Sequence, residues 1–265
     1  MTTTELHLTA AKPLSLSTVT VRVMLPAYNE AVALPAMLND IAATFEAMSM
    51  PYHVTVVDDG SSDDTAEVVL DAVDRMPVEL VPHPRNLGLA AAMRTGLTHV
   101  AKSASDDDII ITLDSDNTQP VGLMPRMIQL IQEGHDVVIA SRYQRGSRVL
   151  GVPAFRRFTA MVAGILFKCL FPIQGVRDYT CGYRAYRVRA IRQGLAEYGD
   201  RFITEEGFSC MVDLLLKLSR LNLIFGEVPM ILRYDQKDGA SKMPVGRTIT
   251  QTLKLALRRR MGIFD

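Results

Sequence analysis

The chain has 265 residues, of which 48% are hydrophobic and 22% are charged, a composition typical of a folded protein and not of a disordered one. Its 29 basic and 29 acidic residues cancel, which argues against a protein that wraps nucleic acid with a basic surface. The three cysteines, Cys169, Cys181 and Cys210, have no CxxC spacing, so we expect no disulfide framework and no cysteine-bound zinc, which favours a reducing compartment.

The first half of the chain alternates predicted strands and helices. Short apolar or β-branched runs predict strands over 19–25, 54–57, 78–81, 109–113 and 136–140. Helices are expected over 31–48, after a capping Ser62 or Asp63, and over 86–102. This alternation predicts an α/β fold with a mostly parallel central sheet flanked by helices.

Polar clusters follow three of the expected strands directly. They lie at 26–30, 58–62 and 114–116. Ligands of open parallel sheets bind beyond the carboxyl ends of the strands, so these clusters are the first indication of a functional site.

The second half is less regular and more basic. From residue 137 to residue 177 there is no acidic side chain, and a second basic segment ends in Arg258–Arg260. The segment 248–264 has the pattern of a basic amphipathic helix, for which a membrane surface and a docked position on the domain are both open.

No export or membrane-spanning segment is expected. The first 17 residues lack the basic start and apolar core of a signal peptide. The apolar run over 160–171 is interrupted by Lys168 and is shorter than the ~20 residues that a spanning helix needs.

Several site types are excluded by their missing motifs. The sequence contains no GxxxxGK[ST], no GxGxxG after a strand, no HExxH and no GxSxG, and its five histidines do not cluster. By contrast, Asp114-Ser115-Asp116 places two carboxylates one residue apart after a buried strand, where they can share Mg²⁺ or Mn²⁺ with a diphosphate. The same DXD pattern also fits a solvated turn before a helix.

Taken together, four segments resemble the family 2 glycosyltransferases of GT-A fold, a Rossmann-like nucleotide-diphospho-sugar transferase fold. They are Leu25–Glu30 (LPAYNE), Val56–Ser62 (VVDDGSS), Asn86–Leu89 (NLGL) and Asp114–Asp116, in that order. The chain looks most similar to the polyprenyl-phosphate hexosyltransferases, on Arg94–Gly96, Ser141–Tyr143, Asp178 with Cys181–Tyr183, and Gly239–Lys242.

The resemblance implies a role for each matching residue. The positions that would hold the nucleotide are Pro26, Tyr28, Glu30, Val57, Asp59, Asp114 and Ser115. Asp114 and Asp116 match the metal-binding aspartates, and Asp116, Asp178 and Arg142 are the expected catalytic residues. Arg142 and Arg156 match residues that face the acceptor phosphate and the diphosphate, and Lys242 matches a loop that closes over the diphosphate.

Three positions depart from the family pattern. Thr118 stands where the family usually has glutamine, with Gln119 one residue further on, and Cys181 replaces a common serine. The acidic segment Thr204–Glu206 resembles a motif that supplies a general base in sugar-polymerising relatives.

The resemblance implies an inverting, metal-dependent transfer of a hexose, of mannose or glucose type, from a GDP or UDP sugar to a polyprenyl phosphate. A phosphate acceptor is largely ionised at neutral pH, its second pKa being ~6, whereas a hydroxyl acceptor needs a base such as Asp178, Glu205 or Glu206. A hydroxyl acceptor, a non-catalytic nucleotide-sugar-binding module and, least favoured, a nucleic-acid binder are the alternatives.

The expected organisation is a tail over 1–18, the glycosyltransferase domain over 19–245 and the basic helix over 246–265. A lipid acceptor implies a cytoplasmic protein at the inner face of a membrane. Either its own surface helices or a membrane-anchoring partner would hold it there.

Overall fold

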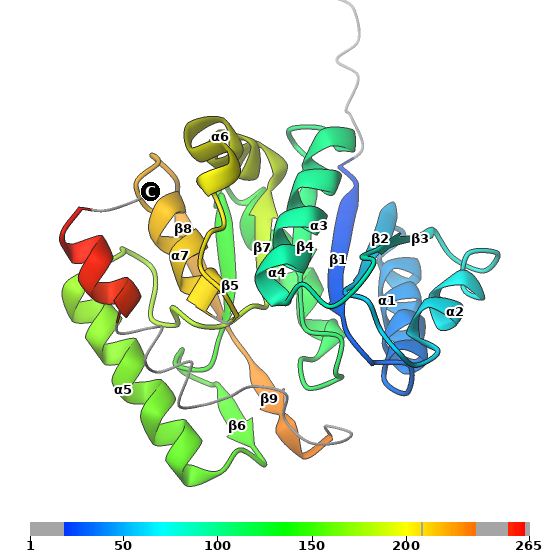
Figure 1. Ribbon diagram of the computed structural model, residues 1–265, viewed down its shortest axis with the longest axis horizontal. Coiled ribbons are helices and arrows are strands. Elements are labelled where there is room, and N and C mark those ends of the chain that lie inside the picture. The colour runs from blue at the N-terminus through cyan, green and yellow to red at the C-terminus, as the bar shows by residue number, and fades with distance from the viewer. Residues whose placement is uncertain (1–18, 208, 237–253, 263–265) are drawn as a thin grey trace, which may run out of the picture.

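The computed structural model describes residues 19–207, 209–236 and 254–262. A seven-stranded sheet runs through its centre in the order β3-β2-β1-β4-β7-β5-β8 (Figure 1). Its strands are β1 (Val21–Ala27), β2 (Tyr52–Asp58), β3 (Val78–Pro82), β4 (Ile109–Thr112), β5 (Val137–Ser141), β7 (Arg184–Arg187) and β8 (Phe225–Pro229). Every pair of neighbours is parallel except at β7, which runs antiparallel to β4 and β5. The expected mostly parallel α/β sheet is therefore confirmed.

Helices flank this sheet. They are α1 (Leu34–Met48), α2 (Thr65–Leu70), α3 (Leu89–Ser103), α4 (Met124–Gln132), α5 (Ala154–Leu170), α6 (Val188–Tyr198) and α7 (Ser209–Leu218), with single turns at Val121–Leu123, Gly199–Arg201 and Tyr234–Gln236. The helix α3 packs against β1 and β2, and α4 packs against β5 and β7. A separate two-stranded ribbon pairs β6 (Arg148–Leu150) with β9 (Ile231–Arg233) in parallel (Figure 1).

The boundaries differ from the sequence-based ranges by a few residues. The first strand does not end before Pro26 but continues to Ala27. The pairing of β1 with β4 ends at Met24 and Thr112, before Pro26 is reached. Because Pro26 has no N–H group, its place beyond this pairing means that no carbonyl of β4 lacks a hydrogen bond on its account. The second helix begins at Thr65, and its N-cap position is occupied by Asp64 and not by the expected Ser62 or Asp63. Asp63 Oδ1 nevertheless accepts the Thr65 N–H at 3.1 Å, so it satisfies one free N–H group of the first turn.

The central strands are apolar on both faces. All four residues of β4 and all five of β5 are buried, as in sheets covered by helices on both sides. Within the described residues, no helix combines the length and the apolarity that a membrane crossing requires.

A buried ion-pair network attaches the helical residues 254–260 to α7. Asp213 pairs with Lys217 at 2.9 Å and with Arg259 at 2.6 Å, and all three side chains are 0% exposed. Leu255 is also buried, and Arg258 pairs with Glu205 at 3.0 Å. For these residues the docked alternative holds; the proposed domain boundary at 245/246 lies outside the described residues.

Asp213 is expected to be the critical member of this network. Asp213→Ala leaves two buried cations without their shared carboxylate, so we expect a loss of about 3–5 kcal/mol in the free energy of unfolding. Arg259→Met leaves Asp213 paired with Lys217 and is expected to cost less. Urea unfolding of both variants measures the difference, and equal losses would contradict the shared-carboxylate arrangement.

Candidate active site

The carboxyl ends of β1, β2 and β4 meet at one edge of the sheet. Backbone and side-chain hydrogen bonds join them directly: Asp59 N–H donates to Ala27 O at 2.8 Å, and Ser115 Oγ donates to Pro26 O at 2.9 Å. The three polar clusters expected after these strands are therefore brought together.

Asp59 shapes the loop at the start of α3. Its side chain is nearly buried, and its carboxylate accepts the N–H groups of Leu87 and Gly88 at 2.9 and 2.8 Å. Its Oδ1 also lies 2.7 Å from His83 Nδ1, and His83 Nε2 lies 2.9 Å from Thr95 Oγ1. Asp59 is thus engaged within the protein, while its expected contact with a nucleotide stays a prediction.

Gly60 allows the loop after β2 to pack closely against the loop before α3. Its φ is +68°, and a Cβ there would lie 2.3 Å from the backbone carbonyl carbon of Arg85. Only glycine permits the two loops to approach this closely without a backbone shift.

The loop after β1 is fastened to the loop after β2. Asn29, with a φ of 53°, donates its N–H to Ser61 Oγ at 2.9 Å and accepts the Ser62 N–H at 2.8 Å. Glu30 N–H donates to Thr65 Oγ1 at 2.9 Å. These bonds hold the half-buried Tyr28 and Glu30 at the sheet edge, where the sequence predicts nucleotide contacts.

Asp114 and Asp116 are each held by a neighbouring side chain. Gln119 Nε2 donates to Asp114 Oδ2 at 2.7 Å, and Gln119 Oε1 accepts the Asp114 N–H. Thr118 Oγ1 donates to Asp116 Oδ1 at 2.7 Å. Gln119 and Thr118, which depart from the family pattern, therefore orient the two carboxylates.

The protein side chains at this edge could bind Mg²⁺ or Mn²⁺ only if a phosphate group supplied further oxygen ligands. Asp114 and Asp116 offer carboxylate oxygens, the ligand type that these hard cations prefer, and a carboxylate has lone pairs beyond the one that its neighbour uses. Among the described residues, no group of three or more histidine, cysteine or acidic side chains forms a metal cluster. A diphosphate and water would have to complete the coordination.

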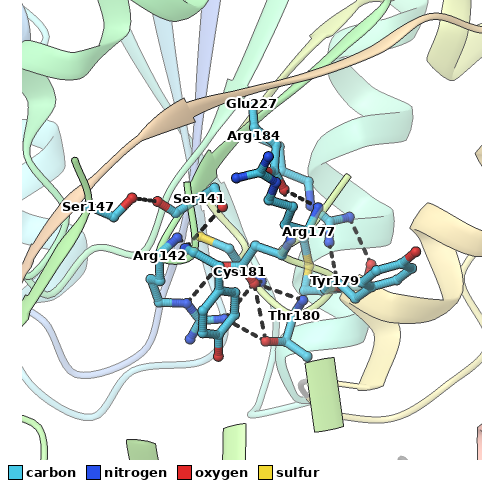
Figure 2. A network of polar contacts seen from close by, with 12 residues as sticks. Ser141, Arg142, Ser147, Arg177, Tyr179, Thr180, Cys181, Arg184 and Glu227 are labelled. Atoms are coloured by element: carbon cyan, nitrogen blue, oxygen red, sulfur yellow. Dashed lines mark hydrogen bonds and ion pairs between the residues drawn. The ribbon is translucent and has the colours of Figure 1, made fainter. Parts of the chain in front are cut away.

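Arg142 and Asp178 form an ion pair with 2.7 Å between Nη2 and Oδ1. Figure 2 shows the polar network around Arg142, with Thr180 and Cys181 beside it. Arg142 donates Nε–H to Asp178 Oδ2 at 2.8 Å and Nη2–H to Oδ1 at 2.7 Å, a bidentate arrangement. Asp178 also accepts the backbone N–H groups of Arg142, Thr180 and Cys181, and it is 0% exposed. Although burial alone would raise the pKa of Asp178, the charge and hydrogen bonds of Arg142 hold it below its ordinary value of 3.8. This carboxylate stays ionised at neutral pH and is poorly suited to take up a proton.

Arg142 has one side turned away from this pair. Its side chain is 20% exposed, and the described residues supply hydrogen-bond acceptors to Nε and Nη2 but none to Nη1. The ring of Tyr143 lies under its guanidinium carbon, 5.6 Å from centroid to carbon. Two N–H groups of a fixed cation are therefore available for an anion.

Gly182 brings the Asp178 loop beside Asp114. A Cβ added at Gly182 would lie 3.6 Å from Asp114 Oδ1, and Gly182 O accepts the Thr112 hydroxyl at 2.8 Å. The segment that follows Asp178 in the chain is therefore a neighbour of Asp114.

Glu227 and His83 were not among the sequence-based candidates. Glu227 Oε1 accepts the N–H groups of Arg177 and Asp178 at 2.6 and 2.7 Å, and burial raises its pKa. A charged residue inside the apolar strand β8 was the available signal for Glu227. For His83 the signal was its position directly after a strand, the same position that the other polar clusters occupy.

The other candidates divide into three groups. Cys181 and Cys210 are buried, and burial raises the pKa of each thiol to about 12, as expected for structural cysteines. Glu205 is paired with Arg258, and Glu206 lies on the surface. Lys242 and the side chain of Arg156 lie outside the described residues.

Residues 22–195 match the family model described as Glycosyl transferase family 2. The dolichol-phosphate mannosyltransferase of Pyrococcus furiosus is 28% identical over 235 residues, which are 88% of this chain and 62% of that protein. The undecaprenyl-phosphate 4-deoxy-4-formamido-L-arabinose transferase of Serratia proteamaculans is 34% identical over 169 residues, 63% of this chain and 48% of that protein. The chain thus spans between about half and three-fifths of the length of these curated relatives.

Among solved structures, glucosyl-3-phosphoglycerate synthase from Mycobacterium tuberculosis superposes with a TM-score of 0.65. It is 21% identical, and the match covers 93% of this chain and 81% of that one. That structure holds Mn²⁺, uridine-diphosphate-glucose and phosphoglyceric acid. At this level of identity the likeness concerns the fold.

Asp178→Asn is expected to destabilise the protein in a pH-dependent way. At neutral pH the variant should lose about 3–5 kcal/mol, because Arg142 loses its buried counter-charge. The ionised carboxylate contributes stability above its unfolded pKa of 3.8, and this contribution is lost as the pH falls through the lower folded pKa. The difference from the native chain in urea unfolding should therefore begin to shrink below pH 3.8 and shrink further as the pH falls; a pH-independent difference would contradict this assignment.

Proposed function

The chain belongs to glycosyl transferase family 2 and has the GT-A fold, and we propose that it transfers a hexose from a nucleoside-diphosphate sugar to a polyprenyl phosphate. The proposed hexose is of mannose or glucose type, the donor base is guanine or uracil, and the anomeric centre is inverted. The polyprenyl-phosphate transferases among its relatives support the acceptor, and the neighbour that holds uridine-diphosphate-glucose supports the donor class.

The observation that carries the proposal is the state of Asp178. Attack by a hydroxyl requires a base, and Asp178 is ionised, buried and already engaged by five N–H groups. A phosphate acceptor needs no base, because its second pKa is ~6 and it is largely a dianion at neutral pH. It needs a fixed cation instead, and the Nη1 side of Arg142 provides one.

The donor would lie along the edge formed by β1, β2 and β4. The half-buried Pro26, Tyr28 and Glu30 would contact the nucleoside, with Tyr28 stacking on the base. Val57 is 0% exposed and the Asp59 carboxylate is bound to the loop before α3, so these two would support the nucleoside site from within the protein. Asp114 and Asp116 would hold Mg²⁺ or Mn²⁺, and Ser115 would line the same turn. The cation, when bound, neutralises the charge that develops on the departing diphosphate. Arg156 and Lys242 are further candidates for contacts to phosphate.

A lipid acceptor also implies a place for the protein. We propose that it acts at the cytoplasmic face of a membrane, bound peripherally or through a membrane-anchoring partner. The acceptors named for the relatives support this location.

The proposal predicts acceptor-dependent transfer. Incubation with GDP- and UDP-hexoses, Mg²⁺ or Mn²⁺ and a short-chain polyprenyl phosphate should release one nucleotide and form a lipid-soluble sugar. Asp116→Asn should lower the rate by about 10²–10³-fold, because it weakens the hold on the cation at the developing charge. Asp40→Asn, on the outer side of α1, is the matched control and should leave the rate unchanged. Transfer only to hydroxyl acceptors would contradict the proposed acceptor.

Glu205 separates the two acceptor classes. Because its carboxylate pairs with Arg258 and the proposed phosphate acceptor needs no base, Glu205→Gln should change the rate less than about threefold. The exposed Glu206→Gln should behave in the same way. A loss of about 10²–10⁴-fold in either folded variant would identify a general base and favour the hydroxyl alternative.

A further inference from the structure

We propose that the outer face of α5 docks on an anionic lipid bilayer, so that the Arg142 site is held next to the membrane surface. This outer face consists of Phe155, Phe158, Met161, Val162 and Ile165, which are between 43% and 68% exposed. The proposal deepens the proposed function and rests on it for the lipid acceptor.

The exposed residues form a continuous stripe along one helix. Their spacing of three and four residues places them on the same side of α5, and the exposed Cys169 continues the stripe. The opposite side is buried in the protein: Phe167 is 0% exposed and stacks against Tyr179 with ring centroids 6.0 Å apart. The apolar outer side of α5 is therefore exposed to water, and an exposed apolar face of this kind indicates an interaction site.

The charges beside the stripe fit a membrane with anionic headgroups. Arg157 and Lys168 are exposed on α5 and lie at one margin of the outer face by helical position. Arg145, Arg148 and Arg177 are exposed in the segments that precede and follow α5 in the chain, and no acidic residue occurs between 137 and 177. From elsewhere in the chain, Asp235 lies beside Gly151 just before α5 and is paired with Arg233. Apolar side chains flanked by cations are the arrangement by which a helix lies at a bilayer surface, each cation near an anionic surface strengthening the attraction.

The inner side of α5 adjoins the candidate active site. A Cβ at Gly164 would lie 3.7 Å from the Tyr143 ring, and Tyr143 packs under the Arg142 guanidinium. Through Phe167, α5 also supports Tyr179, the residue after Asp178. A bilayer against the outer face would therefore lie one helix diameter from the cation proposed to bind the acceptor phosphate.

Vesicle sedimentation of the full chain tests the surface without donor or acceptor. The native chain should bind vesicles that contain phosphatidylglycerol, and the binding should weaken at high salt and on pure phosphatidylcholine. Phe158→Glu/Ile165→Glu should weaken binding by more than about tenfold, because the variant has lost two apolar side chains that would be transferred from water into the bilayer. The matched control is Leu70→Glu/Ile224→Glu, which changes the same charge at side chains that are 58% exposed elsewhere, and it should bind like the native chain.

A second measurement needs no substitution. Cys169 is the exposed cysteine, whereas Cys181 and Cys210 are buried, so a charged thiol reagent reports on the α5 stripe of the native chain. Anionic vesicles should slow this reaction severalfold, and neutral vesicles should not. Equal reaction rates with and without anionic vesicles would overturn the proposal, as would equal binding of the two double variants.

Other occupants give different results. If a second copy covers the outer face, Phe158→Glu/Ile165→Glu converts a dimer into a monomer in the absence of lipid, and the proposal fails. Transfer to a soluble short-chain acceptor separates the two claims. Transfer without vesicle binding overturns the docking surface alone, whereas vesicle binding without transfer to any acceptor overturns the proposed function.

Discussion

A carboxylate that water does not reach must be surrounded by hydrogen-bond donors, and Asp178 is the residue around which this site is organised. Three N–H groups of Arg142 and two from the backbone after Asp178 converge on it. Glu227 in turn accepts the N–H of Asp178 from a neighbouring strand. The arrangement ties the ends of β5 and β8 to the loop before β7. It also fixes the guanidinium of Arg142, whose Nη1 lies away from Asp178. The buried carboxylate of Asp178 thus determines the position of the Arg142 charge.

The polar residues at the ends of the strands fall into two groups by what they contact. Asp59, Gly60 and Gln119 are engaged with the protein itself: they hold loops or orient other carboxylates. Asp114, Asp116 and Arg142 are held in place and retain capacity toward a ligand. Because Gly182 lies beside Asp114, the donor diphosphate, held through a divalent cation on Asp114 and Asp116, would lie near the acceptor phosphate proposed to bind Arg142. That geometry suits transfer between two anions, which would repel each other in water.

Much of the sheet was predictable because its strands are continuous apolar runs ended by turn residues. The antiparallel β7 was not: its sequence, Arg184–Arg187, has two arginines and no apolar pattern, yet Arg184 is fully buried through hydrogen bonds to Met211 O and Tyr179 O. The local pattern also located Asp114 and Asp116, because they follow a strand, whereas Arg142 was indicated by the resemblance to the family. They did not show that Asp178, 36 residues beyond Arg142, pairs with it, since only the folded chain brings these residues together.

The central claim is that the outward side of Arg142 binds the acceptor phosphate, and it is tested most directly by phosphorus NMR titration of a short-chain polyprenyl phosphate. Arg142→Lys keeps the positive charge opposite Asp178 but removes the planar guanidinium, which can bind Asp178 and the acceptor phosphate at the same time. The account predicts binding at least about tenfold weaker in this variant. Arg157→Lys, a matched change on the exposed side of α5, should bind the phosphate like the native chain. Equal affinities for all three proteins would contradict the account.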